Sequence, residues 1–268
     1  MNEPELLLIF LAVGFGAGIL IGMLGVGGGV IFVPSLYYLL PYFGVSSASV
    51  LYFAISISLL SGAIAASFST TFHLYAKNVD VKKGLLFALG SSLAAFVSVI
   101  FVTSVGPEFL KIIFAVILFI VAIYMLLDMQ FKSKSGRTRE SKLCYLPIIG
   151  LSVGVLASFT GLGGGVIFLP VLHYLYLLNT KMAVGTSSFV TALTMISASL
   201  SFFVHQENWT DSFNIAHLGI FVALPLGVGA IAGAKFGFNL VKKLKPHSIK
   251  KIFAVLLIMV VAKIIFSL

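Results

Sequence analysis

The sequence predicts an all-α polytopic membrane protein built as two inverted repeats of about five helical elements each. The chain is 60% hydrophobic and only 9% charged, whereas a soluble domain is about 25% charged. Several apolar runs reach the roughly 20 residues that a helix needs to cross a bilayer. A glycine-rich string at residues 25–34 recurs almost letter for letter at residues 161–170, once in each half. Short broken helices are expected directly after these strings.

The whole chain is interpreted as one transmembrane domain, residues 1–268, that arose by duplication. Beyond the strings, Gly14 and Gly18 recur as Gly150 and Gly154 at a constant offset. Internal similarity over such a length indicates a repeat architecture. The expected units are repeat 1, a basic linker and repeat 2, at residues 1–130, 131–143 and 144–268.

Each half contains five apolar elements in the same order. In the first element of repeat 1, Gly14, Gly18 and Gly22 are four residues apart, a spacing that favours close helix packing. The second element of each half has about a dozen residues and reaches roughly 18 Å, less than a 30 Å hydrocarbon core. The predicted elements are 6–24, 30–40, 45–72, 84–105, 109–127, 146–160, 166–178, 182–204, 215–234 and 250–266.

Charge and cysteine content exclude several classes of protein. Residues 1–5 carry no basic region, so the first element is expected to be a retained span and not a signal peptide. The single cysteine, Cys144, leaves no partner for an intrachain disulfide and no thiolate cluster for a metal. The net charge of +9 comes from loops between spans, which is typical of contact with anionic lipid and not of nucleic-acid binding. We expect no cofactor.

Loop charges predict the orientation in the cell (inner) membrane. Basic residues cluster in the linker and in the loop 235–250, whereas the segment 205–211 has no lysine or arginine. The positive-inside rule therefore places the linker and the loop 235–250 in the cytoplasm and both termini outside. An odd number of elements per half makes the two halves inverted. Two arrangements of elements one and two stay open in each half, namely two full crossings or one re-entrant hairpin. Loop charges do not distinguish them, because both return the chain to the side of the membrane on which element one began.

The glycine strings form the predicted binding site. Three consecutive glycines destabilise a helix more than close packing requires, although packing is the alternative explanation. The helix that follows begins with unpaired amides and partial positive charge. Inversion of one half brings two such ends together near the midplane, which predicts an anion site. The predicted binding glycines are Gly27, Gly28, Gly29, Gly163, Gly164 and Gly165.

Hydroxyl side chains in the third element of each half are the second set of candidates. Neutral hydroxyl donors suit an oxyanion that must be released again, although serine and threonine also join helices to one another. The assigned residues are Thr186, Ser187, Ser188 and Ser49, while Thr191 and Thr194 share a face with Ser187. Pro34 and Pro170 fall inside the short helices, where we expect structural hinges.

Catalysis is not expected. The sequence contains no nucleophile–base pair, no paired carboxylates in an apolar element and no cluster with metal-ligand spacing, so no catalytic or metal residues are assigned. His173, in the second short helix, is expected to have a packing or hydrogen-bonding role. His73 is expected near an interface, in contact with solvent.

The chain resembles the TauE/SafE sulfite-exporter family, also called the toluene-sulfonate uptake permease family. The resemblance covers essentially the whole chain and rests on the two G-x-G-G-G-x-x-x-x-P strings and on the segment 183–188. It implies plasma-membrane carriers of sulfite, sulfonates and other small organosulfur or carboxylate anions, often exporters. The site residues that it implies are those at 27–29, 163–165 and 186–188, whereas residues 48–53 depart from the repeat's pattern.

We therefore expect a secondary transporter, an exporter, that moves a small oxyanion by alternating access at a midplane site. The substrate would be sulfite, a sulfonate or another organosulfur anion. The alternatives are an anion channel of the same architecture and a non-transporting membrane scaffold or assembly partner. The expected partners are a small inorganic or organic anion and the lipid bilayer, and a homo-oligomer is compatible with the sequence.

Overall fold

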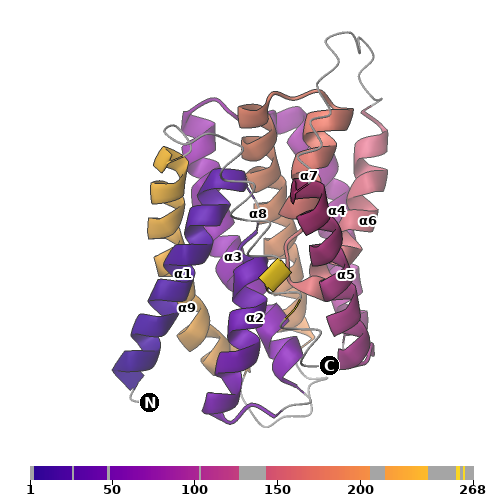
Figure 1. The fold of residues 1–268 in the computed structure, drawn as a ribbon. Helices are drawn as coiled ribbons and strands as arrows, with labels where there is room; N and C mark the ends of the chain where they lie inside the picture. The colour runs from indigo at the N-terminus through magenta and orange to yellow at the C-terminus, as the bar shows by residue number, and fades with distance from the viewer. Residues whose placement is uncertain are drawn as a thin grey trace.

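All secondary-structure elements in the described part of the chain are helices, as predicted (Figure 1). The computed structural model describes residues 3–25, 27–46, 49–102, 104–126, 143–205, 215–240, 258, 259 and 262. The linker therefore lies outside this part except for Leu143, and so does most of the predicted last element at 250–266.

The first half follows the predicted order of elements. Its helices are α1 (Glu3–Leu24), α2 (Gly29–Leu39) with a 3₁₀ turn η1 (Leu40–Phe43), α3 (Val50–Tyr75), α4 (Val81–Val102) and α5 (Pro107–Leu126). Helix α1 ends where Gly25 adopts a positive φ of 65°, a conformation that glycine adopts without steric cost. At the other end of α2, Gly44 with φ 79° stops the 3₁₀ turn.

The second half repeats this order, with one difference in its short helix. Its helices are α6 (Tyr145–Thr160), α7 (Gly165–Pro170) with a π-helical turn η2 (Val171–Leu175), α8 (Thr180–Val204) and α9 (Ile215–Leu240). The sequence predicted one short helix over 166–178, but the α-helical part ends at Pro170. Proline has no amide hydrogen for the helical ladder, so the chain continues in the wider π pattern.

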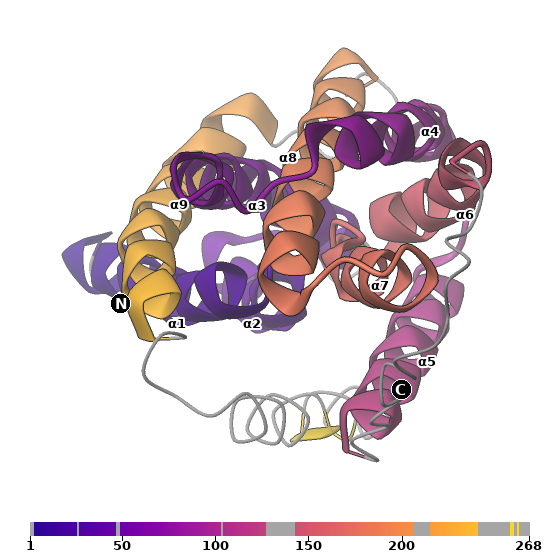
Figure 2. The same cartoon turned by 90° about the horizontal axis from the view of Figure 1, so that it is seen from above.

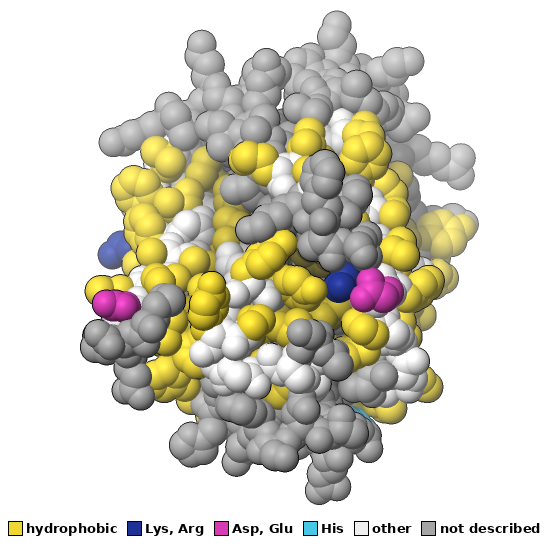
Figure 3. Space-filling view, turned by 60° about the horizontal axis from the view of Figure 1, so that its bottom comes forward, with side chains coloured by type: hydrophobic (Ala, Val, Ile, Leu, Met, Phe, Trp, Pro, Cys, Tyr) yellow, Lys and Arg dark blue, Asp and Glu magenta, His cyan; other side chains and the backbone are white. Residues whose placement is uncertain are grey.

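Five described helices are long and apolar enough to cross a membrane. They are α1, α3, α4, α8 and α9, whereas α6 and the two short helices with their turns have fewer than 18 residues. Hydrophobic side chains cover much of the face seen in Figure 3, with few charges among them. The protein is therefore a multi-pass membrane protein.

Helices α1 and α9 pack backbone to backbone through small residues. Gly14 lies against the carbonyl of Leu226 and Gly22 against that of Ala234, so closely that a Cβ atom would collide. The two helices run in the same direction, because both residue numbers rise together along the contact. This confirms the packing role predicted for the glycines of the first element.

Helices α4 and α6 make the matching contact on the other side of the bundle. Gly150 lies against the carbonyl of Phe87 and Gly154 against that of Ser91, again without room for a Cβ atom. These two helices are also parallel. Figure 2 shows α3 and α8 in the centre, with α1 and α9 on one side and α4 and α6 on the other.

The central helices α3 and α8 are antiparallel. Ser69 pairs with Ser188, while Gly62, nearer the start of α3, faces Met195, further along α8. Helix α9 runs with α3, since Ser61 contacts Ala223 and Gly227 lies against Ile64. Side-chain bonds from α8 to successive carbonyls of α4 show that those two helices are parallel. Helices α1, α3 and α9 therefore run one way and α4, α6 and α8 the other.

Replacing Gly18 by valine should separate α1 from α9, because a Cβ atom at this position would collide with the backbone of Ala230. We expect a loss of about 1–3 kcal/mol of stability, the usual cost of overpacking. Thermal unfolding of the purified protein in detergent measures this loss. Gly16→Val is the matched control, because nothing lies within 4 Å of a Cβ atom at Gly16; equal melting temperatures for the two variants would contradict the packing role.

Candidate functional site

The two glycine strings meet in the middle of the bundle and lie directly against each other. A Cβ atom at Gly29 would collide with the carbonyl of Gly161. A Cβ atom at Gly165 would lie 2.7 Å from the carbonyl oxygen of Gly25 and 2.9 Å from the amide nitrogen of Gly27. Residues 25, 27–29 and 161–165 together are called the glycine crossing below. All of them are buried.

The two strings have different backbone conformations. In the second string Gly161, Gly163 and Gly164 have φ values of 68°, 73° and 75°, a region that other residues rarely adopt. In the first string, Gly28, which corresponds to Gly164, has φ −61°. Gly164 therefore requires glycine for its conformation, whereas Gly28 requires only the space that a side chain would fill.

The first amides of both short helices lie at the crossing. In α2 the first hydrogen bond is donated by Ile31 to the carbonyl of Gly28, and in α7 Ile167 donates in the same way to Gly164. The amides that precede Ile31 and Ile167 have no acceptor within their helices, and helix dipoles add partial positive charge there. The crossing therefore offers donors to an electron-rich ligand.

Serine hydroxyls from the two central helices hold the carbonyls of the crossing. Ser187 Oγ lies 3.1 Å from the carbonyl oxygen of Gly25 and 3.2 Å from that of Gly165, so it bridges the two strings. Ser58 Oγ donates to the carbonyl of Gly161 at 2.9 Å. Ser187 was a predicted site residue. Ser58 was not, although it lies in the hydroxyl-rich third element of the first half.

Two of the other predicted hydroxyls lie away from the crossing. Thr186 Oγ1 accepts a hydrogen bond of 2.9 Å from the amide of Asp80, just before α4 begins. Ser49 precedes the first turn of α3, roughly 13 Å along the helix from Ser58. Ser188, in contrast, lies at the crossing, because a Cβ atom at Gly25 would lie 2.9 Å from its Oγ. The structure thus brings Ser187 and Ser188 to the strings, but not Thr186 or Ser49.

The two prolines differ in their surroundings. Pro34 lies within α2, which continues past it to Leu39, while Pro170 ends the α-helical part of α7. Local backbone geometry thus changes at Pro170 and not at Pro34. Hinge motion at either proline stays a prediction.

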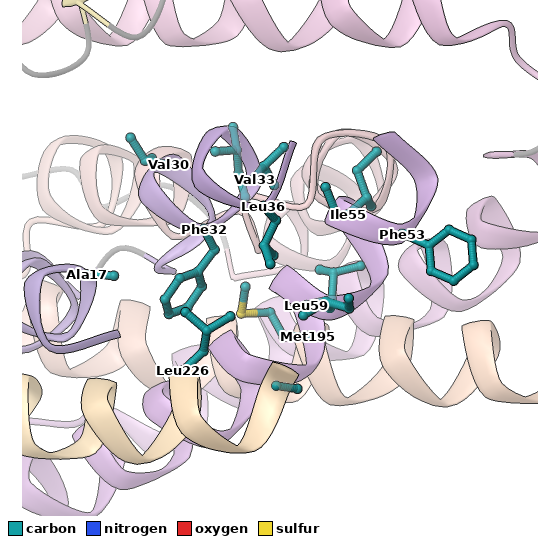
Figure 4. Close-up of a cluster of buried hydrophobic side chains, with 14 of the residues drawn as sticks. Ala17, Val30, Phe32, Val33, Leu36, Phe53, Ile55, Leu59, Met195 and Leu226 are labelled. Carbon is teal, nitrogen blue, oxygen red and sulfur yellow. The ribbon is translucent and has the colours of Figure 1, made fainter. Parts of the chain in front are cut away.

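Two residues of α8 complete the crossing and were not assigned to it from the sequence. Thr191 is fully buried and touches both strings, and Met195 fills the space between them. Figure 4 shows Met195 among Phe32, Leu36 and Leu226 in the buried core. The signal for Thr191 was its helical spacing of four residues from Ser187. An apolar methionine offers no such signal.

Of the expectations for the two histidines singled out from the sequence, the structure contradicts one and agrees with the other. The expectation that His73 is solvated is wrong, because only 4% of the residue is exposed. Helix α3 extends past it to Tyr75, and Phe238 of α9 packs on its ring, with the centroids 5.1 Å apart. His173 Nδ1 lies 2.8 Å from the carbonyl oxygen of Leu178, which agrees with the predicted hydrogen-bonding role.

The crossing contains no charged side chain. The ion pairs of the described residues lie at helix starts, where Lys83 pairs with Asp80 at 3.3 Å and Lys111 with Glu108 at 3.1 Å. Within the described residues, no three or more histidine, cysteine or acidic side chains are close enough to hold a metal ion. The arrangement can therefore bind a ligand through amides and hydroxyls.

Comparison with known proteins assigns the chain to a family over almost its full length. A family model described as sulfite exporter TauE/SafE matches residues 10–264. A probable membrane transporter protein of Methanocaldococcus jannaschii is 30% identical over 91% of this chain and 90% of its own length. A probable membrane transporter protein of Haemophilus influenzae is 30% identical over 95% and 96%, respectively. No solved structure matches the chain.

Replacing Ser187 by alanine should destabilise the crossing, because it removes the donor shared by the carbonyls of Gly25 and Gly165. An unpaired buried polar group costs about 1–3 kcal/mol, which thermal unfolding in detergent can measure. Ser199→Ala is the matched control in the same helix, since the buried Ser199 hydroxyl has no partner among the described residues. A stability for Ser187→Ala equal to that of the control would refute the bridging role.

Proposed function

The chain belongs to the TauE/SafE sulfite exporter family, which is a family of membrane transporters and not of enzymes, and on this premise we propose that it is a secondary carrier of a small oxyanion. The observation that supports this proposal is the glycine crossing. There two helices begin face to face inside a membrane protein, and the first amides of each have no acceptor within their own helix. Such backbone is tolerated at membrane depth only where it is buried in protein or lines a cavity.

The proposed sign of the substrate follows from the donors at the crossing. Helix starts attract anions through free amides and through the dipole. Ser188 adds a neutral hydroxyl beside Gly25, and Ser187 holds the carbonyls of both strings in place. A neutral hydroxyl binds without the strong attraction of a fixed positive charge. This set suits an oxyanion that must be released on the other side. The family's description favours sulfite as the substrate and export as the direction. A sulfonate or another organosulfur anion is proposed beside sulfite because it presents a similar oxyanion head group.

The proposed mechanism is alternating access by two inverted halves, residues 1–130 and 144–268. Three pairs of corresponding helices support it, since α1 and α6, α3 and α8, and α4 and α9 run in opposite directions. The contact of α1 with α9 also has its counterpart in that of α6 with α4. Because glycine contacts join α1 to α9 and α4 to α6 across the halves, the units that would rock against each other are these two flanks, each with helices from both halves. This motion would expose the crossing to each side in turn.

A carrier fits the described structure better than a channel. The residues of the crossing are buried, and the strings touch through their backbones. A channel needs a continuous aqueous path in its conducting state, whereas a carrier passes through closed states. A scaffold role would not explain why two helices are broken at matching positions.

Replacing Gly28 or Gly164 by valine should abolish transport, because the new side chain would enter the crossing. A Cβ atom at Gly28 would lie 2.5 Å from the ring of Phe32, and one at Gly164 would lie 2.7 Å from the ring of Phe168. We expect sulfite flux into proteoliposomes to fall to about a tenth or less, since hydrogen bonds to a charged ligand are each worth about 1.5–3 kcal/mol.

Gly16→Val is the control for insertion, because it adds the same side chain where nothing lies within 4 Å. It should insert and transport as the wild type does. Normal flux in both crossing variants would refute the proposed site. Flux that does not saturate with sulfite would favour a channel.

We also propose that the linker faces the cytoplasm and both termini face outward. Cys144 is the chain's single cysteine, is exposed and follows the linker. A membrane-impermeant maleimide should label it in inside-out vesicles and not in intact cells. The matched probe is Cys144→Ser combined with Tyr42→Cys, because Tyr42 is 73% exposed in η1, at the proposed outer end. This variant should label in intact cells, and the reverse pattern would overturn the orientation.

A further inference from the structure

Thr191 faces the glycine crossing with both branches of its side chain. It lies in α8, one turn after Ser187. A Cβ atom at Gly165 would lie 2.7 Å from Thr191 Oγ1, and one at Gly27 would lie 3.2 Å from Thr191 Cγ2. The hydroxyl is therefore directed at the place where the two strings meet.

The Thr191 hydroxyl has no hydrogen-bond partner within the described part of the chain, although the residue is 0% exposed. A threonine inside a helix usually bonds to the carbonyl four residues earlier. Thr194, three residues further on, does so with Val190 at 2.9 Å and also pairs with Ser91 at 2.6 Å. A buried polar group without a partner is rare and unfavourable. At a proposed binding site, the missing partner is most simply the ligand.

Met195 lies one turn beyond Thr191 on the same face of α8 and is also fully buried. Its terminal methyl or sulfur lies against three glycines from three segments, Gly27, Gly62 and Gly163. Glycine at all three positions leaves a space that this one side chain fills. Methionine is flexible and unbranched, so it can leave such a space by rotating about its side-chain bonds.

We propose that Thr191 donates a hydrogen bond to the transported anion and that Met195 occupies the anion's place in this closed conformation. The part of Met195 beyond Cβ comprises Cγ, Sδ and Cε, which together are close in size to sulfite. The site would therefore accept a compact inorganic oxyanion, or an oxyanion head group of that size. This inference rests on the proposed function, because it assigns a ligand to the same crossing.

The test compares Thr191→Val with Thr194→Val in the purified full-length protein. Valine has nearly the shape of threonine but no hydroxyl. Thr191→Val should melt at the same temperature as the wild type or higher, because it removes an unpaired hydroxyl. It should bind sulfite at least about tenfold more weakly, the weight of a hydrogen bond to a charged group. Thr194→Val should show the opposite pattern, a lower melting temperature and unchanged sulfite affinity, because it removes the 2.6 Å hydrogen bond between Thr194 and Ser91.

Thr191→Ser should restore the affinity, since it returns the hydroxyl. Affinity is measured from the rise of melting temperature with sulfite, sulfate or thiosulfate concentration. Sulfite affinity of Thr191→Val within twofold of the wild type, or a marked fall in its melting temperature without anion, would overturn the role of Thr191. Failure of the wild type to bind or transport any of these anions would instead overturn the proposed function itself.

Met195 variants test the second part of the proposal. Met195→Ala should bind sulfite more tightly than the wild type, because no side chain then competes for the space. Met195→Phe should bind it more weakly, because a rigid ring cannot leave the space as readily. Equal affinities in both variants would show that Met195 is an ordinary core residue. Leu59→Ala is the matched control and should leave sulfite affinity unchanged. Leu59 belongs to the same buried cluster as Met195 (Figure 4), but none of its atoms is among those nearest to a glycine of the crossing.

Discussion

The structure depends on one constraint, that two broken helices must bury their open backbone inside a membrane protein. Each string satisfies this by lying against the other, with Gly29 over the carbonyl of Gly161 and Gly165 over that of Gly25. Ser187 and Ser58 then pair the carbonyls that the breaks leave open. Any side chain at the contact would separate the strings and leave polar groups in an apolar interior. This requirement accounts for glycine at both strings.

The rest of the bundle is arranged so that the strings can meet. Glycine contacts bring α1 to α9 and α4 to α6, which forms two flanks around the central pair α3 and α8 (Figure 2). The hydrophobic effect does not drive helices together within lipid, because lipid tails are themselves apolar. Close packing of small residues supplies the attraction instead. The buried polar side chains lie mainly along α3 and α8. The hydroxyls of α8 are thus held where a ligand at the crossing could reach them.

Much of this arrangement followed from local patterns. Helix spans follow from apolar runs, because length and hydropathy alone decide them. The packing role of Gly14 and Gly22 followed from their spacing. Ser187, assigned to the site from the sequence, lies at the strings, while its binding role stays a prediction. Thr186 and Ser49 were grouped with it because they are hydroxyls in the same kind of element, and Thr186 also because the family resemblance implies residues 186–188. Their distance from the crossing depends on which face of the helix, and which turn along it, contacts the strings. Tertiary packing sets both, so the local sequence does not reveal them. His73 was misjudged for the same reason, since Phe238 covers it from a distant part of the chain.

The sequence by itself determined the class of protein, the order of its helices, the family and the duplicated glycine breaks. These depend on composition, periodicity and motif, which are properties of neighbouring residues. Only the tertiary structure decided that the two strings lie in direct backbone contact, which face of α8 meets them, and that the Thr191 hydroxyl faces the strings with no partner among the described residues. Whether a hydroxyl is paired depends on the backbone opposite it. The backbone opposite Thr191 comes from both strings, one in each half of the chain, so no local pattern could have revealed it.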